Sequence, residues 1–234
     1  MKRFVLPFVV AVAVHAAPPA FSQQGKVEVL WLNQATFRIT SPGGKVIVTD
    51  PWLLPHPGLM NPLTPPQYRN LEALGKVDVL LVTHAHPDHI VDAPAIAKLN
   101  SIPLWGAGDL NMALNTLGVL PAAQLPRFAV GGTVMPAPGI KVTATHAEHS
   151  SVYVWNNPAT GKPDLVLIPI GGHFGMNPAD AAYALREIIK PKYAIPMHYG
   201  TNPFNRGTPQ QLLEALGAAA VKVLPLKPGE KAEF

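Results

Sequence analysis

The sequence predicts an α/β protein in which two β-sheets pack together and helices cover their outer faces. Two patterns support this prediction. Each half of the chain has a group of β-rich segments followed by an alternation of helix and strand. Residues 77–83 (VDVLLVT) form a nearly continuous apolar run, which is typical of a strand buried on both faces. The 234 residues, 48% hydrophobic and 14% charged, can bury a sizeable core and show no linker between independent domains.

The first half of the folded region begins with β-rich segments at residues 27–32, 36–40 and 45–50. The last two are joined by Ser41-Pro42-Gly43-Gly44, and proline followed by glycine predicts a type II turn within a hairpin. Residues 51–70 contain six prolines. A long irregular segment of this kind inside a domain is more often a functional loop than filler.

The rest of the chain alternates between helical and β-rich patterns. We predict helices at 90–100, at 109–117 with Asp109 as its cap, at 178–190 with proline in the first position, and at 208–220. We predict strands at 128–130, 133–135, 140–145, 151–155, 164–170, 193–200 and 221–226.

Residues 1–22 have the layout of a secretory signal peptide. Lys2 and Arg3 precede an apolar stretch, and Ala20-Phe21-Ser22 is a small-x-small cleavage pattern. Cleavage after Ser22 would leave a single domain at 23–234 without a segment suited to stable membrane insertion. We therefore predict an exported, periplasmic protein, with a retained N-terminal helix or anchor as the alternative.

The charge balance and the absence of cysteine exclude some classes of partner and ligand. Lysine and arginine number 18 against 14 acidic residues, and this small excess without a basic stripe predicts no nucleic-acid partner. No cysteine is present. Any metal ion must therefore be bound by histidine and carboxylate.

The segment VLLVTHAHPDHIVD (79–92) places three histidines and an aspartate directly after an apolar strand. His84, His86 and Asp88 share one side of an extended chain, and a turn into a helix brings His89 beside them. Two imidazoles and a third from elsewhere make an open catalytic zinc site. A carboxylate and another imidazole can hold a second ion beside the first.

Other histidines also follow apolar strands, at positions 146, 149, 173 and 198. Strand ends that converge are the usual place for chemistry in α/β folds. His56 lies in the proline-rich loop, where we expect it to be solvated or to face the substrate.

The segment THAHPDH resembles the His-x-His-x-Asp-His motif of the metallo-β-lactamase superfamily. Asp50 in VTDPWL, the histidines of HAEHSS and His198 in IPMHYG follow the family's order. Together with WLNQATFRI and IGGHFGMNPADAA, they resemble the branch of metal-dependent hydrolases related to ascorbate-phosphate lactonases. The resemblance covers nearly all of 23–234 and implies a four-layer αβ/βα sandwich of two mixed β-sheets with outer helices.

The resemblance also implies ligands for one or two divalent metal ions, with zinc favoured and manganese or iron as alternatives. One ion would be bound by His84, His86 and His149, with His149 preferred over His146 because the ligand of this branch directly precedes Ser-Ser. The second ion would be bound by Asp88, His89 and His198. Asp50 would be buried and would position the loop that carries the histidines, although a strand-end turn aspartate is the alternative.

One position departs from the family pattern. Where the superfamily has a bridging aspartate, this chain has Gly172 followed by His173. Either His173 substitutes as a ligand, or it is a capping residue and the second ion is weaker or absent.

These residues predict hydrolysis of an ester, lactone, amide or phosphodiester in a small-molecule substrate by a metal-activated water. Asp88 would be the catalytic residue that orients this water and takes a proton. The resemblance favours a lactone-like ester, and Trp52, Leu54 and Met60 would form a wall of the pocket. Tyr199 and Arg206 could meet a polar substrate group or be structural. The alternatives are an exported non-catalytic metal-binding protein, an iron-dependent redox member of the superfamily and a β-lactamase.

Overall fold

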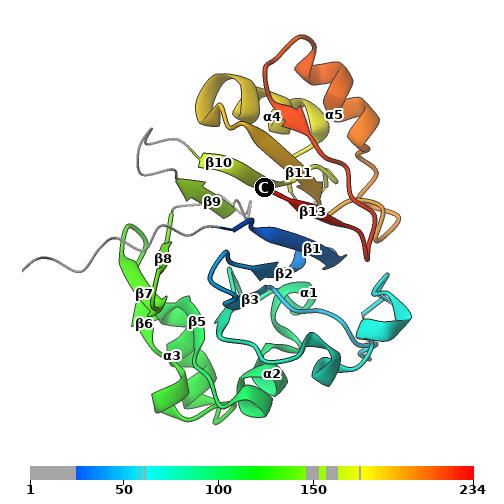
Figure 1. Ribbon diagram of the computed structural model, residues 1–234. Coiled ribbons are helices and arrows are strands. Elements are labelled where there is room, and N and C mark those ends of the chain that lie inside the picture. Colours follow the sequence, from blue (N-terminus) through cyan, green and yellow to red (C-terminus); the bar gives the residue numbers. More distant parts are fainter. Residues whose placement is uncertain (1–24, 58, 61, 146–152, 157–162, 174) are drawn as a thin grey trace, which may run out of the picture.

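The computed structural model describes residues 25–57, 59–60, 62–145, 153–156, 163–173 and 175–234. A seven-stranded sheet has the order β13-β1-β2-β3-β4-β5-β6 and a four-stranded sheet has the order β12-β11-β10-β9 (Figure 1). Both sheets are mixed: in the first, β1–β2 and β2–β3 are antiparallel and β3–β4 is parallel. In the second, β9–β10 is antiparallel and β10–β11 is parallel.

The strands of the larger sheet are β1 (Glu28–Asn33), β2 (Thr36–Thr40), β3 (Val46–Thr49), β4 (Val79–Leu81), β5 (Leu104–Ala107), β6 (Arg127–Phe128) and β13 (Lys231–Glu233). The smaller sheet contains β9 (Tyr153–Asn156), β10 (Pro163–Pro169), β11 (Tyr193–Met197) and β12 (Lys222–Val223). A separate hairpin is formed by β7 (Thr133–Ala137) and β8 (Ile140–Thr143).

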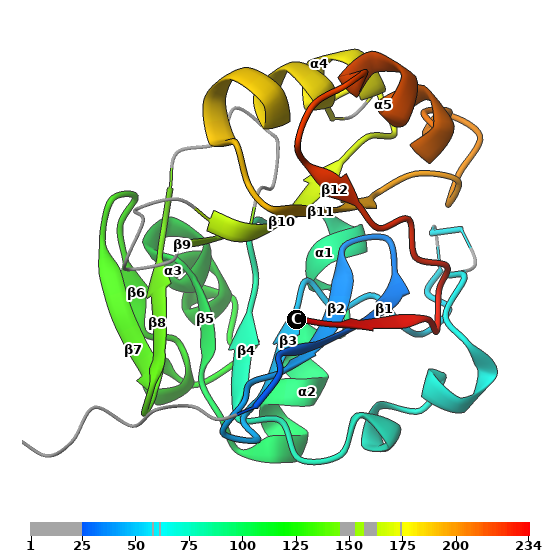
Figure 2. The same cartoon turned by 45° about the horizontal axis from the view of Figure 1, so that its top comes forward.

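The helices are α1 (Pro87–Ile90), α2 (Ala93–Asn100), α3 (Gly108–Thr116), α4 (Pro178–Tyr183) and α5 (Pro209–Leu216). Helices α2 and α3 lie on the outer side of the larger sheet, and α4 and α5 lie on the outer side of the smaller sheet (Figures 1 and 2). A π-helical segment (Ala184–Ile189) continues α4, and 3-10 helices occur at Pro66–Tyr68, Leu71–Leu74 and Ala122–Gln124. The α5 helix begins with a capping box in which Thr208 and Gln211 satisfy each other's backbone N–H groups.

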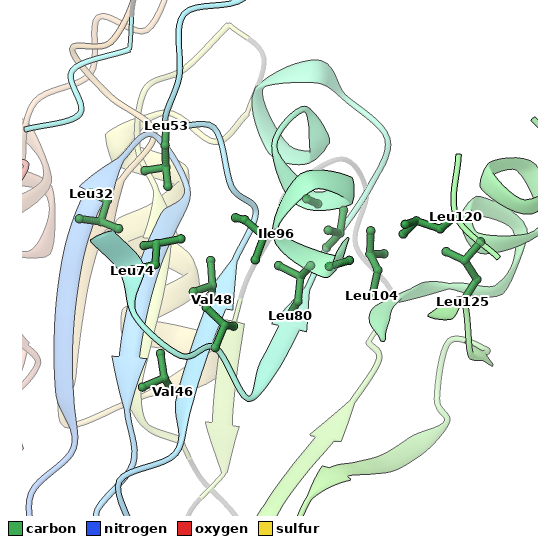
Figure 3. Close-up of a cluster of buried hydrophobic side chains, with 14 of the residues drawn as sticks. Leu32, Val46, Val48, Leu53, Leu74, Leu80, Ile96, Leu104, Leu120 and Leu125 are labelled. Carbon is green, nitrogen blue, oxygen red and sulfur yellow. The ribbon is translucent and has the colours of Figure 1, made fainter. Parts of the chain in front are cut away.

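Three separate apolar clusters establish the four layers. One lies between the larger sheet and α2 and α3, and contains Leu80, Ile96 and Leu104 (Figure 3). A second lies between the smaller sheet and α4 and α5. A third joins the inner faces of the two sheets and contains Trp31 and Ile195.

Residues of strand β1 pack into two of these clusters. Leu30 and Leu32 belong to the outer cluster, whereas Val29 and Trp31 belong to the cluster between the sheets. Successive side chains of a strand point to opposite faces, so an unbroken apolar run buries both faces at once. The predicted α/β class and the two packed mixed sheets are confirmed.

Several details of the predicted elements are corrected. The β2–β3 hairpin forms, but Gly44 and not Gly43 has a positive φ, so the turn is not type II. A Gly44 N–H to Ser41 carbonyl bond of 2.8 Å followed by left-handed glycine fits a type I turn with a bulge. Helix α3 begins at Gly108, and Asp109 lies in its first turn instead of capping it.

Two strands, β5 and β13, were not predicted. The β5 segment is only four residues long and includes a glycine, and β13 is three residues long with a lysine and a glutamate on either side of an alanine. Both exist because the backbones of β4 and β1 offer hydrogen-bonding edges to them. No helix among the described residues is long and apolar enough to span a membrane, and the predicted leader at 1–22 lies outside that part of the chain.

Candidate metal centre

The histidine motif lies where β4 ends and α1 begins. His84 and His86 are in the extended connection, and Asp88 and His89 are in the first helical turn, where Pro87 starts the helix. Proline suits this first position because it has no backbone N–H to leave unpaired. His198 directly follows β11 of the other sheet. The site therefore lies between the two halves of the chain.

Three donor atoms, one each from Asp88, His89 and His198, lie within 4.8 Å of one another. We call these three residues the metal group, or donor group. The Nε2 atom of His89 is 3.6 Å from Asp88 Oδ2, and the Nε2 atom of His198 is 3.5 Å from it. Donors on a tetrahedral zinc ion are about 3.4 Å apart when each bond is about 2.1 Å long. The spacing and the nitrogen–oxygen chemistry of the group thus fit a divalent ion.

Asp50 is hydrogen-bonded to Thr83 and His89, which lie at the start and near the end of the histidine motif. It is fully buried, and its carboxylate accepts hydrogen bonds from the Thr83 backbone N–H (2.7 Å), the Thr83 hydroxyl (2.7 Å) and His89 Nδ1 (2.8 Å). With the Nδ1 proton held by Asp50, His89 keeps the lone pair on Nε2 for the metal group. The predicted burial of Asp50 is confirmed, and its bonds to Thr83 and His89 agree with the predicted positioning role.

The same network reaches His84. Because the Thr83 hydroxyl donates to Asp50, it accepts from His84 Nδ1 at 2.9 Å, and His84 Nε2 keeps its lone pair. That Nε2 is 2.8 Å from Nδ1 of His86, so the two nitrogens face one small region. His149 and His146, the predicted third ligand and its alternative, lie outside the described residues.

Two further histidines, His173 and His56, are not members of the donor group. The imidazole of His173 stacks on Phe204 with ring centroids 5.2 Å apart, and its role as a ligand stays a prediction. His56 bonds Asp92 through Nε2 at 2.7 Å. The same Asp92 carboxylate accepts from the backbone N–H groups of Leu53 and Leu54. His56 thus helps to fasten the proline-rich loop, a structural role that the sequence did not reveal.

A cavity of about 400 Å³ opens above the metal group. Trp52 and Met60 line it as predicted, but Leu54 lies at a separate surface depression. Tyr199 donates to the Leu226 carbonyl at 3.1 Å and has a structural role. The other lining residues are Gln34, Leu59, His84, His86, Pro87, Asp88, His89, Pro169, Gly175, Met197, His198, Asn202 and Phe204.

Sequence reasoning missed the buried amides around His198. Gln34 is fully buried and contacts both Asp88 and His198. Asn205 is 1% exposed, and its Nδ2 lies 3.2 Å from His198 Nδ1. Gln34 lies within the segment WLNQATFRI, but the sequence does not place either amide beside His198, because the turn after β1 and the loop after β11 meet only in the folded chain.

The site lowers the pKa of the Asp88 carboxyl group and raises the pKa of the buried His89 imidazole. Burial alone would raise the pKa of Asp88, but hydrogen bonding with His198 and the charge of His89 hold that pKa well below its ordinary value. Burial opposes protonation of His89, yet the adjacent Asp50 carboxylate raises the pKa of His89 above 6.5. In the metal-free protein Asp88 is therefore anionic near neutral pH while His89 retains affinity for a proton.

Metal affinity is expected to rise with pH. The Nδ1 proton of His89 is bonded to Asp50, so the second proton sits on Nε2 and must leave before an ion binds there. Apparent Zn²⁺ affinity should increase by up to about tenfold per pH unit until pH exceeds the pKa of His89, and then level off. Competition with a chromophoric chelator at pH values below and above this pKa measures the Zn²⁺ affinity. An affinity that does not change with pH would contradict the role of His89 as a metal ligand.

Comparisons with known proteins agree with this geometry. A family described as "Beta-lactamase superfamily domain" matches residues 28–198. A UPF0173 metal-dependent hydrolase of Polaromonas sp. is 52% identical, covering 100% of this chain and 99% of the relative. A second, from Cupriavidus necator, is 49% identical over 90% of this chain and 86% of the relative.

Among solved structures, Igni18, a metallo hydrolase of the archaeon Ignicoccus hospitalis, superposes with a TM-score of 0.72. It is 26% identical, and the alignment covers 89% of this chain and 98% of that one. These likenesses and the donor group favour an enzyme over a non-catalytic metal-binding protein. The chain belongs to the metallo-β-lactamase superfamily and is one of its metal-dependent hydrolases.

Proposed function

We propose that this hydrolase acts on a small lactone or related ester, with zinc as its metal, in the periplasm. The observation that carries the proposal is the position of Asp88 Oδ2 between two imidazole Nε2 atoms at the end of a cavity of about 400 Å³. A cavity of this size suits a small molecule. The residue pattern of 1–22 supports export.

The walls of the cavity support a substrate with an apolar portion. Trp52, Leu59 and Met60 come from the proline-rich loop, and Phe204 comes from the loop after β11. Met60 and Phe204 are 41% and 53% exposed, so apolar surface continues to the mouth of the cavity. An acyl chain or ring would bury this surface while its carbonyl group reaches the donor group.

The reaction follows from these positions. A divalent ion supplies Lewis-acid polarisation of a carbonyl and lowers the pKa of water. Asp88, anionic near neutral pH, orients the attacking water as a hydrogen-bond acceptor. A bond forms from water oxygen to the acyl carbon, the acyl–oxygen bond breaks, and the proton passes through Asp88 to the departing alkoxide. Because its pKa is low, Asp88 holds the proton only briefly before passing it on.

The test is a substrate panel with the purified protein. The panel contains γ- and δ-lactones of increasing alkyl length, para-nitrophenyl esters, a phosphodiester and a chromogenic β-lactam, each measured with Zn²⁺, Mn²⁺ and Fe²⁺. We expect kcat/KM for the longer lactones to exceed that for the phosphodiester and the β-lactam by at least about tenfold. Preference for the β-lactam would establish the lactamase alternative and overturn the lactone proposal.

A further inference from the structure

The Gln34 side chain contacts lone pairs of Asp88 and His198 that a bound metal ion would also use. Its Nε2 donates to Asp88 Oδ2 at 2.8 Å and lies 3.0 Å from His198 Nε2. An amide nitrogen carries two hydrogens, so it can satisfy both acceptors at once. Asp88 and His198 are two of the three residues of the metal group.

The backbone fixes Gln34 in this position. Gln34 has φ of 43° and His198 has φ of 57°, a left-handed conformation that is unfavourable for residues with a side chain. The backbone N–H of His198 donates to the Gln34 carbonyl at 3.2 Å, which ties the β1–β2 turn to the end of β11. Strain retained at two contacting residues of a site points to a functional constraint.

The proton arrangement on His198 leaves Nε2 as an acceptor. The buried Oδ1 of Asn205 has no hydrogen-bond partner among the described residues, while Asn205 Nδ2 faces His198 Nδ1. A half-turn of the Asn205 amide lets Oδ1 accept from Nδ1–H, which is the partner that metal-binding histidines usually have. His198 Nε2 then has a free lone pair that faces Gln34 Nε2 and the metal group.

The opposite end of the Gln34 amide contacts the Thr201 hydroxyl, which donates to Oε1. A hydroxyl can both donate and accept. A half-turn of the Gln34 amide therefore keeps this contact, with Nε2 donating to Thr201, and directs Oε1 at Asp88 and His198. In that orientation the amide oxygen would repel Asp88 unless a cation lies between them.

We propose that the side-chain amide of Gln34 has two orientations. Without an ion its nitrogen donates hydrogen bonds to Asp88 and His198, and with an ion bound the amide is turned so that its oxygen faces the ion. Gln34 thus sets the affinity for the ion at Asp88, His89 and His198. The inference rests on the metal dependence of the hydrolase and not on the identity of its substrate.

The test compares Gln34→Leu and Gln34→Glu with the wild type. Zn²⁺ and Mn²⁺ affinities are measured by chelator competition, ions per chain by elemental analysis, and Tm with and without metal. We expect Gln34→Leu to weaken the binding of one ion by about 10–100-fold. We expect Gln34→Glu to tighten it and to lower the Tm of the metal-free protein, because a second carboxylate then faces Asp88.

The matched control is Gln124→Leu. Gln124 is a partly buried amide that does not line the cavity, and its Nε2 donates to the carbonyls of Ala97 and Ile102. It should lose stability without changing metal affinity. Unchanged affinity in both Gln34 variants, whatever their Tm, would overturn the inference. Absence of bound metal in the wild type would overturn the proposed hydrolase mechanism as well, whereas failure of the lactone panel alone would leave this inference standing.

Discussion

Asp88→Asn is expected to lower kcat/KM by at least about a thousandfold and to remove one metal ion per chain. The substitution preserves the size of the side chain but removes the negative charge that lies 3.6 Å and 3.5 Å from the Nε2 atoms of His89 and His198. Both the ion and the proton acceptor are lost together. Elemental analysis and steady-state kinetics on the best panel substrate measure the two effects.

The control for this prediction is Asp109→Asn. Asp109 is an exposed aspartate in the first turn of α3, and it contacts the backbone N–H of Leu110. Its loss should leave metal content and kcat/KM within about twofold of the wild type. Full metal content and near-normal turnover in Asp88→Asn would contradict the assigned role of Asp88.

Asp50→Ala is expected to destabilise the protein by about 3–5 kcal/mol. Three donors lose their acceptor at once: the backbone N–H and hydroxyl of Thr83 and Nδ1 of His89. Asp50 is completely buried, so water does not readily replace it. Chemical denaturation of the metal-free protein measures the loss, and metal titration should show weaker binding because His89 is no longer oriented.

Asp78→Ala is the matched comparison. Asp78 lies just before β4, at the end opposite the metal group, and it accepts from Lys45 Nζ and from the Val46 backbone N–H at 3.0 Å each. Its carboxylate is 12% exposed and water can partly replace it. We expect a cost of about 1 kcal/mol and unchanged metal affinity. Equal destabilisation by the two substitutions would show that Asp50 is an ordinary strand-end aspartate.

The features that sequence reasoning captured are those encoded in local patterns. Apolar runs such as 77–83 specify buried strands, and the spacing of His84, His86 and Asp88 is enough by itself to indicate a metal site. A proline at the start of a helix, as at Pro178, marks its first position. These signals depend only on residues that are neighbours along the chain.

The features that sequence reasoning missed depend on distant segments. Gln34 contacts Asp88 and His198 only because the β1–β2 turn packs against the end of β11. His56 reads as a loop histidine until Asp92 is placed beside it. Strand β13 has too little apolar character to signal itself, and its backbone pairing with β1 creates it. Contacts of this kind leave no periodicity to detect.

The donor group joins parts of the chain that lie far apart in sequence. His89 comes from the half built around the larger sheet, and His198 comes from the half built around the smaller one. An ion shared between them closes a loop of about 100 residues, and a permanent link of that length restricts the unfolded chain by about 4–5 kcal/mol. In a chain without cysteine, such a link takes the place of a disulfide, and metal supply rather than oxidation decides whether it forms.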